Sequence, residues 1–459
     1  MTELVFNTDL IKKYDKSGPR YTSYPTALQF TEEFGEQDYL QQVKLSNERN
    51  TPLSLYFHIP FCDTICYYCG CNKIVTKNRK HAQPYLDAVY KELALQSPLY
   101  KATRIVKQLH WGGGTPTFIS HNQMTELMQQ TRKSFTLLDD DSGEYSIELD
   151  PREVTPSSVN LLRKLGFNRI SLGVQDFNPK VQQAVNRIQS YKETRDVILA
   201  ARKNDFHSIS LDLIYGLPFQ TVTSFSETVD KVLELEPDRL SVFNYAHLPE
   251  MFKTQRQIKT EDLPSSEDKL AILQNVTNKL IEAGYEYIGM DHFAKPNDEL
   301  AIAQKERKLY RNFQGYSTHS DCDLVALGIT SIGKVADSYS QNIKTIKEYT
   351  EAVDKSQLPI FRGVKLTEDD ILRREVINQL ICHFELSFKD IEQSFNINFP
   401  DYFENELIQI KEMQGDALLE LTAEKIIVRP EGKLLIRNIC MVFDIYLKQN
   451  KLQRFSKTI

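Results

Sequence analysis

The sequence predicts an α/β protein built around a partial barrel of six β/α units, and three observations support this fold class. Short apolar runs rich in β-branched and aromatic residues recur through the middle of the chain. Helix-period stretches such as QPYLDAVYKELALQ and SVNLLRKLG lie between them, which is typical of βαβ units with a parallel sheet. Glycines and polar residues gather near the ends of these runs, where β/α barrels build their active sites.

The expected elements follow one another in a simple order. The six predicted strands occupy residues 53–59, 105–111, 145–150, 169–174, 208–216 and 239–245. A seventh run, YEYIGMDHF at 285–293, is expected to extend or flank the sheet. We predict an N-terminal arm and lead-in over residues 1–50, the barrel over 51–355 and a mainly helical C-terminal domain over 356–459.

The two flanking regions differ from the barrel in pattern. The N-terminal stretch SGPRYTSYPTALQF looks irregular, but its aromatic and proline content predicts a segment that packs on something. Beyond residue 360 the pattern predicts a capped helix from Thr367, a second helix from Ser387, a short hairpin and a final helix. That order of elements is similar to a winged-helix module.

Composition excludes several classes of protein. The 459 residues include 56 Lys+Arg and 62 Asp+Glu, a net charge of −6, so no basic surface for nucleic acid is expected. No window approaches about 18 uninterrupted apolar residues, which predicts no membrane span. The N-terminus also lacks the apolar stretch of a signal peptide. We therefore expect a cytosolic protein with reduced thiols, acting as a monomer.

Four of the seven cysteines lie in the segment FHIPFCDTICYYCGCNK: Cys62, Cys66, Cys69 and Cys71. A disulfide framework is the weakest interpretation in a reducing compartment. Structural zinc sites usually take two ligand pairs from separate places, and no second pair follows here. The C-x3-C-x2-C spacing can instead wrap three corners of a 4Fe–4S cluster and leave one iron open. The spacing does not determine whether Cys71 binds that iron.

This spacing after an apolar strand resembles that of radical S-adenosylmethionine (SAM) enzymes. Seven segments in order resemble the family of oxygen-independent coproporphyrinogen III oxidases: YFHIPFCDTICYYCGCNK, HWGGGTPT, IELDPRE, GVQDFN, DLIYGLP, FNYAHLP and YIGMDHFA. The likeness runs from residues 17–27 to 434–444. It implies a radical-SAM partial (β/α)6 barrel that binds a 4Fe–4S cluster and SAM, in one or two copies.

The resemblance also implies a reaction. Members of this family convert two propionate side chains of coproporphyrinogen III to vinyl groups without oxygen, which gives protoporphyrinogen IX in haem biosynthesis. A 5′-deoxyadenosyl radical removes a hydrogen from the propionate β-carbon, and carbon dioxide and an electron are then lost. The expected partners are this substrate and an electron donor that the sequence does not identify. Two alternatives stay open: a haem chaperone of the wider family without oxidase activity, and a zinc-stabilised regulator with a winged-helix tail.

The same resemblance assigns the site residues. Cys62, Cys66 and Cys69 would bind the cluster, and Tyr56 would lie against the sulfonium of SAM. Cys71 would lie near the cluster without being a permanent ligand. The other expected cofactor contacts are Tyr68, Gly113, Gly114, Thr115, Glu148, Gln175, Arg187, Asp212, Ala246 and Ile332.

Several of these residues have a simpler structural interpretation. Gly112 to Gly114 could form only a tight turn, or could bring the backbone close to a ligand. Glu148 and Asp212 lie in strands expected to be buried, where a carboxylate needs an ion pair or a ligand. Arg187 could lie on the surface, although a guanidinium suits a carboxylate ligand.

Other residues receive separate predictions. His58 is expected to be a core histidine that hydrogen-bonds to the backbone. Cys322, Cys382 and Cys440 are expected to be ordinary buried thiols. The substrate is a polycarboxylate, so basic residues should contact it, and Arg20 and Arg311 are the candidates.

Overall fold

The computed structural model describes residues 4–449, which pack into two compact units. The barrel unit comprises Phe30–Val276 and Asp321–Lys365. The other, which we call the three-segment unit, comprises residues up to Gln29, Thr277–Ser320 and the chain from Leu366 onward. The three domains expected from the sequence, with boundaries after residues 50 and 355, divide the chain differently and stay a prediction.

The barrel unit contains the six predicted strands. They are β1 (Leu53–Ile59), β4 (Ile105–Gly113), β6 (Glu144–Leu149), β7 (Arg169–Gln175), β8 (Ser208–Tyr215) and β9 (Arg239–Asn244). They pair in parallel in the order β9-β8-β7-β6-β4-β1, which confirms the predicted barrel sheet. The strands that the sequence did not predict are β2 (Phe61–Cys62), β3 (Ile74–Val75), β5 (Thr136–Leu137), β14 (Asp323–Leu327), β15 (Ile332–Val335), β16 (Ser338–Asn342) and β17 (Ile360–Lys365).

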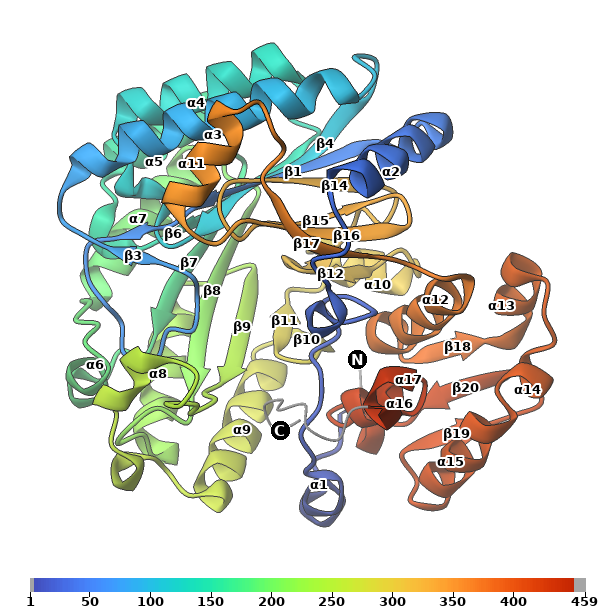
Figure 1. The fold of residues 1–459 in the computed structure, drawn as a ribbon. Helices are drawn as coiled ribbons and strands as arrows, with labels where there is room; N and C mark the ends of the chain where they lie inside the picture. The colour runs from blue at the N-terminus through green and yellow to red at the C-terminus, as the bar shows by residue number, and fades with distance from the viewer. Residues whose placement is uncertain (1–3, 450–459) are drawn as a thin grey trace. The chain divides into compact units, whose positions relative to one another are not determined.

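Helices alternate with these strands and lie along the outside of the sheet (Figure 1). They are α2 (Glu36–Arg49), α3 (Ala82–Gln96), α4 (His121–Ser134), α5 (Pro156–Leu165), α6 (Pro179–Ala184), α7 (Tyr191–Lys203), α8 (Val222–Glu234), α9 (Ser266–Glu282) and α11 (Ile346–Asp354). Several begin with a hydroxyl that accepts from the third backbone N–H of the helix, among them Ser120, Thr155, Ser190, Thr221 and Thr345. Such N-caps fix where each helix starts after its βα loop.

Strand β1 shows how the sheet separates core from site. Leu55, Phe57 and Ile59 are fully buried, while Tyr56 and His58 point to the opposite face because side chains alternate along a strand. The ring of Phe57 packs edge-on against Trp111 at 6.4 Å, on the core face. The opposite face, which carries Tyr56 and His58, is the inner face of the sheet.

The three-segment unit includes α1 (Thr8–Tyr14), β10 (Glu286–Gly289), β11 (His292–Ala294), α10 (Glu299–Lys305), β12 (Tyr310–Asn312) and β13 (Gly315–Ser317). Strands β10 and β11 pair antiparallel, so the predicted seventh run forms two short strands instead of one. The run changes direction at Met290, where the backbone adopts a φ of 55°.

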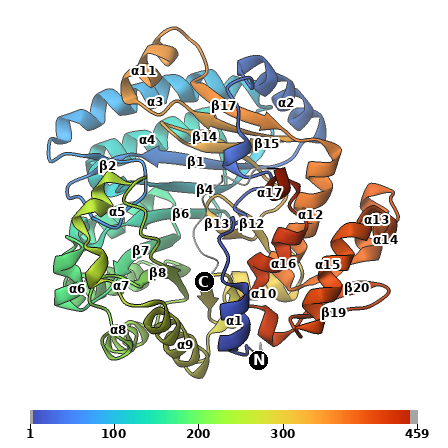
Figure 2. The same cartoon turned by 60° about the horizontal axis from the view of Figure 1, so that its bottom comes forward.

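The C-terminal part of this unit is mainly helical (Figure 2). It comprises α12 (Glu368–His383), β18 (Glu385–Ser387), α13 (Phe388–Phe395), α14 (Phe399–Tyr402), α15 (Glu404–Gly415), β19 (Leu419–Leu421), β20 (Lys425–Val428), α16 (Ile436–Val442) and α17 (Ile445–Gln449). Its sheet has the order β18-β20-β19, and Thr367 caps α12. The predicted helices from Thr367 and Ser387, the hairpin and the helix after it are all present. The predicted order was incomplete, because α14 and α15 lie between the second helix and the hairpin, and α17 follows α16.

The N-terminal arm is packed within this unit. Tyr21 and Tyr24 are buried, and the Tyr21 hydroxyl donates to Asp444 Oδ2 at 3.0 Å. Arg437 Nε donates to the Pro19 carbonyl at 2.9 Å. The arm therefore packs against the folded chain, as predicted. Across residues 4–449, the structure contains no helix with the length and hydropathy needed to cross a membrane.

Candidate active site

The cysteine loop follows β1 and is fastened to the end of β4. Gly114 N donates to the Ile59 carbonyl at 2.8 Å, and Thr115 N donates to the Phe61 carbonyl at 2.7 Å. A Cβ on Gly114 would lie 2.7 Å from the Phe61 carbonyl oxygen. The glycine therefore permits two backbones to approach closely. The structure shows this approach between the loop and β4, while the predicted ligand contact of Gly113 and Gly114 stays a prediction.

Two side chains from outside the loop and one from its own end hydrogen-bond to the backbone in the middle of the loop. Asn186 Nδ2 donates to the Ile65 carbonyl at 2.8 Å, and Lys73 Nζ donates to the Cys69 carbonyl at 2.9 Å. Gln255 Nε2 donates to the Tyr68 carbonyl at 3.0 Å. Backbone groups that a free loop would leave to water are thus fixed by the barrel.

Three donors point at the cysteine sulfurs. Thr115 Oγ1 lies 3.7 Å from Cys62 Sγ. Arg187 Nη1 lies 3.7 Å from Cys66 Sγ, and Arg152 Nη2 lies 4.0 Å from the same sulfur. Positive charge and hydrogen-bond donors beside a sulfur stabilise the thiolate, which is the form that binds metal.

One carboxylate organises the two arginines. Asp150 Oδ2 accepts from Arg152 Nη2 at 2.6 Å and from Arg187 Nη1 at 2.9 Å. Arg187 Nη2 donates to the Gly173 carbonyl at 2.6 Å, but its Nε is buried without a hydrogen-bond partner. The sequence pointed to Arg187 but missed Arg152, whose only signal was its place in the IELDPRE segment.

The loop thiols have different acidities. A hydrogen bond to Cys71, together with the charge of Lys73, lowers the pKa of the Cys69 thiol to about 6. Burial raises the pKa of the Cys62 thiol to about 11. Cys66 is buried, Cys62 and Cys69 are half-buried, and Cys71 is exposed. Closely spaced thiols with donors to sulfur fit an iron–sulfur cluster, which needs cysteine thiolates and hydrogen bonds to them.

A second group of side chains lines the inner face beside the loop. The Tyr56 ring stacks on His110 with centroids 5.8 Å apart, and its hydroxyl lies 3.1 Å from His58 Nδ1. His110 Nε2 lies 3.3 Å from Glu148 Oε1, and Gly113 N donates to Glu148 Oε2 at 3.1 Å. These contacts bring together Tyr56, Gly113 and Glu148, and they add His110, which the sequence analysis missed.

Two predictions about burial have different outcomes here. The Glu148 side chain is 48% exposed, so the expectation of a buried carboxylate is wrong for this residue, because it lies on the open inner face. His58 is buried, and its Nε2 lies 3.2 Å from the Asn72 carbonyl, so the expected backbone hydrogen bond is confirmed.

Asp212, Gln175 and Arg187 converge around β7. Asp212 lies opposite Gly173 in the β7–β8 register, and Ser171 Oγ donates to its Oδ2 at 3.1 Å. Burial, together with the charge of Glu148, raises the pKa of Asp212 to about 6. A Cβ on Gly173 would lie 2.8 Å from Gln175 Nε2 and 3.1 Å from Arg187 Nη2, so both side chains cross this glycine.

The remaining predicted cofactor contacts are Ala246, Tyr68 and Ile332. Gln255 Nε2 donates to the Ala246 carbonyl at 3.2 Å as well as to the Tyr68 carbonyl, so these two residues are neighbours. The Tyr68 side chain packs on a core cluster that includes Val185. Ile332 begins β15, two strands from β1, and is half-buried.

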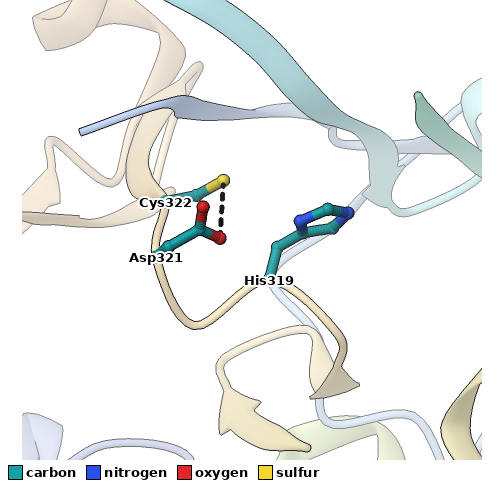
Figure 3. Close-up of side chains that lie close together, drawn as sticks. All are labelled: His319, Asp321 and Cys322. Atoms are coloured by element: carbon teal, nitrogen blue, oxygen red, sulfur yellow. Dashed lines mark hydrogen bonds between the residues drawn. The ribbon is translucent and has the colours of Figure 1, made fainter. Parts of the chain in front are cut away.

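A separate segment between β13 and β14 carries residue types that bind metals: His319, Asp321 and Cys322 (Figure 3). Cys322 Sγ lies 3.9 Å from Asp321 Oδ1, and Asp321 also pairs with Lys107 at 2.8 Å. The boundary between the two units falls after Ser320, so we assign no metal site to this segment. Cys322, Cys382 and Cys440 are buried, as expected.

Comparison with known proteins relates this site to a family. Residues 56–232 match the radical SAM superfamily, and residues 366–435 match the HemN C-terminal domain. The chain is 55% identical to the oxygen-independent coproporphyrinogen III oxidase of Pseudomonas aeruginosa over 99% of both chains. It is 51% identical to that of Escherichia coli over 98% of both.

A solved structure agrees with the fold as well. The coproporphyrinogen III oxidase (HemN) of Escherichia coli, described as a radical SAM enzyme, superposes with a TM-score of 0.93 at 49% identity. The match covers 97% of this chain and 100% of that one. The chain therefore belongs to the family of oxygen-independent coproporphyrinogen III oxidases within the radical SAM superfamily.

Proposed function

We propose that this chain oxidatively decarboxylates two propionate side chains of coproporphyrinogen III, which gives protoporphyrinogen IX in haem biosynthesis. The observation that carries the proposal is the loop of three thiols, Cys62, Cys66 and Cys69, on which donors from the barrel face the sulfurs of Cys62 and Cys66. Relatives that match almost the full length of the chain are oxidases of this kind.

Different residues of the chain would bind the cluster and SAM. A bound 4Fe–4S cluster and SAM supply the radical that starts the reaction. Cys62, Cys66 and Cys69 would hold the cluster, while Arg187 places positive charge beside Cys66. Tyr56 would lie against the sulfonium of SAM.

The other predicted cofactor contacts extend this assignment. Glu148 is exposed enough to bind a ligand, and it would take the amine or ribose of SAM. Asp212 would hold a second ligand, and Gly113, Gly114, Thr115, Gln175, Ala246 and Ile332 would complete the contacts. Tyr68 and Cys71 would lie beside the cluster.

The alternatives have less support. A haem chaperone without oxidase activity is not favoured by the full-length relatives, which are named as oxidases. A structural zinc site would need four protein ligands, whereas the fourth thiol of this loop, Cys71, is exposed. We further propose that the protein acts in the cytosol as a monomer and takes electrons from a separate donor protein.

An anaerobic turnover assay tests the proposed function. The protein is reconstituted with iron and sulfide and given SAM, a reductant, an electron acceptor and coproporphyrinogen III. Protoporphyrinogen IX and 5′-deoxyadenosine are expected, and both should be absent from Cys66→Ala. The exposed Cys71 gives a second comparison, because Cys71→Ala should keep its iron if it is not a permanent ligand. A wild-type protein with an intact cluster and neither product would contradict the proposal and favour the chaperone.

A further inference from the structure

His110 lies in a row of side chains that crosses the inner face of the barrel. Tyr56 in β1, His110 in β4 and Ser146 in β6 are direct neighbours in the register of the three parallel strands. Their side chains therefore project to the same face of the sheet. Glu148 lies two residues beyond Ser146 on β6, and so on that face as well. We call Ser146, His110 and Glu148 the Ser-His-Glu chain.

Two polar contacts and one ring contact fix the position of His110. Its Nδ1 lies 2.6 Å from Ser146 Oγ, and its Nε2 lies 3.3 Å from Glu148 Oε1. Its ring stacks on Tyr56 with an angle of 11° between the two ring planes. The His110 side chain is only 15% exposed, whereas the Glu148 side chain is 48% exposed. The histidine is therefore the more deeply placed of the two, and it leaves the carboxylate open to a ligand.

The partners of His110 determine which ring nitrogen carries the proton. Desolvation inside the barrel tends to raise the pKa of Glu148, but hydrogen bonds from His110 and Gly113 outweigh it and keep that pKa below its usual value. The ionised carboxylate can only accept, so His110 Nε2 donates to it. In a neutral imidazole Nδ1 is then the acceptor, and the Ser146 hydroxyl donates to it. Ser146 thus selects the tautomer that Glu148 requires.

The carboxylate of Glu148 is held on one side only. Oε1 contacts His110 Nε2, and Oε2 accepts from Gly113 N at 3.1 Å. A Cβ on Gly112 would lie 3.0 Å from both Glu148 Cδ and His110 Nε2, so the backbone of β4 packs directly against this contact. Within residues 4–449 these two groups are the hydrogen-bond donors to Glu148. Each carboxylate oxygen therefore keeps the capacity to accept a further hydrogen bond from a ligand.

We propose that His110, held by Ser146, is a positioning residue that orients Glu148 and supports the ring of Tyr56 for the binding of SAM. The inference rests on the proposed function, because it takes SAM to be the ligand that Glu148 and Tyr56 contact. An N–H or O–H group of SAM would donate to the free side of the carboxylate. A carboxylate that is already fixed by two donors loses less freedom when the ligand binds, and this increases affinity.

Equilibrium dialysis of SAM against reconstituted holoprotein tests this without turnover, because no reductant is added. Ser146→Ala removes the donor to Nδ1 and should weaken SAM binding by about 10-fold, a loss within the range for neighbours in one hydrogen-bond network. Ser146→Thr keeps a hydroxyl and should restore most of the affinity. His110→Phe keeps a ring beside Tyr56 but loses both nitrogens, so it should weaken binding at least as much as Ser146→Ala. Wild-type affinity in His110→Phe would overturn the inference.

Two controls separate positioning from a general loss of stability. Ser190→Ala also removes one hydroxyl from the barrel unit, but Ser190 is exposed and caps α7, so it should lower stability and leave the affinity for SAM unchanged. In a Glu148→Gln background, Ser146→Ala should weaken SAM binding by less than about threefold, because the neutral amide no longer presents a charged acceptor to His110. An equal loss in both backgrounds would show that Ser146 acts through the fold instead of through Glu148, and would overturn the inference.

The outcomes also distinguish this inference from the proposed function. A wild-type protein whose affinity for SAM depends on Ser146 and His110, but that makes no protoporphyrinogen IX, would contradict the oxidase and keep the positioning role. A wild-type protein that turns over coproporphyrinogen III, with a Ser146→Ala variant that binds SAM as tightly, would overturn the positioning role and keep the oxidase.

Discussion

The barrel unit contains two buried arginine–aspartate networks, one at each end of its parallel strands. Arg104 precedes β4 and pairs with Asp323 at the start of β14, at the amino ends of the strands. Arg187 pairs with Asp150, which follows β6 at the carboxyl ends. Both arginines are buried, so burial alone does not distinguish the two networks.

The networks differ in how completely they are satisfied. Arg104 donates through Nε to the Thr51 carbonyl at 2.6 Å, through Nη1 to Ser46 Oγ at 2.7 Å and through Nη2 to Asp323 Oδ2 at 3.0 Å. Arg187 instead leaves Nε without a partner and directs Nη1 toward Cys66. A closed network fixes the strand ends, whereas an open one keeps bonding capacity for a ligand.

Breaking the closed network should have the largest effect. Asp323→Ala leaves the Arg104 guanidinium buried without its counterion, and removing one partner of a buried pair costs about 3–5 kcal/mol. Denaturant unfolding followed by circular dichroism measures this loss of stability. Iron content after reconstitution at low temperature should stay normal, because Asp323 lies at the end of the strands away from the cysteine loop.

An exposed pair provides the matched control for that variant. Asp354 pairs with Lys91 at 2.5 Å, and both side chains are about half exposed. Asp354→Ala should therefore change the stability by no more than about 1 kcal/mol. Equal losses for the two variants would contradict the assignment of Asp323 to a closed structural network.

Breaking the open network should affect the cluster more than the fold. Arg187→Gln removes the donor nearest to Cys66, and losing such a partner of a metal ligand typically costs about 10- to 100-fold in metal affinity or activity. Iron per chain and the rate of 5′-deoxyadenosine formation measure this loss. Arg104→Gln should show the reverse pattern, with reduced stability and normal iron content. The comparison fails if Arg187→Gln unfolds as easily as Asp323→Ala and keeps full activity.

The sequence predicted the half of the sheet that reads as separated apolar runs. Each of the six parallel strands, from β1 to β9, is separated from the next by a helix and loops. The length and hydrophobicity of each run were therefore sufficient to predict these strands. The edge beyond β1 was missed because β15 and β16 are short and polar, as in SYSQN, and pair antiparallel. β14 was missed as well, because DLVAL is five buried residues without alternation.

The sequence also predicted only part of the candidate active site. Cysteine spacing and ordered motifs pointed to the loop, and the structure brings Tyr56, Gly113 and Glu148 to the face beside it. Arg152 and His110 were missed because their roles depend on contacts across the chain. Arg152 meets Cys66 from 86 residues away. A local sequence pattern carries no information about contacts between residues far apart in the chain. Such contacts become visible only in the folded structure.

The last prediction compares the pH dependence of the closed network with that of the open inner face of the sheet. Burial tends to raise the pKa of Asp323, but hydrogen bonds from Ser46 and Thr51 outweigh it and hold that pKa below its usual value. Asp323 therefore adds stability above its unfolded pKa, and this stability is lost as pH falls. Asp212, on the open inner face, has its pKa raised to about 6, mainly by burial. Its contribution is complete below its unfolded pKa of 3.8 and is lost as pH rises through about 6.

Asp212→Asn isolates this opposite dependence. The variant carries no titrating group there, so its free energy of unfolding relative to wild type should rise between pH 4 and pH 7, because wild type alone loses stability over that range. Denaturant unfolding of both proteins at several pH values measures the difference. A constant difference between Asp212→Asn and wild type would mean that Asp212 keeps an ordinary pKa, and that water reaches the inner face of β8 more freely than the packing there implies.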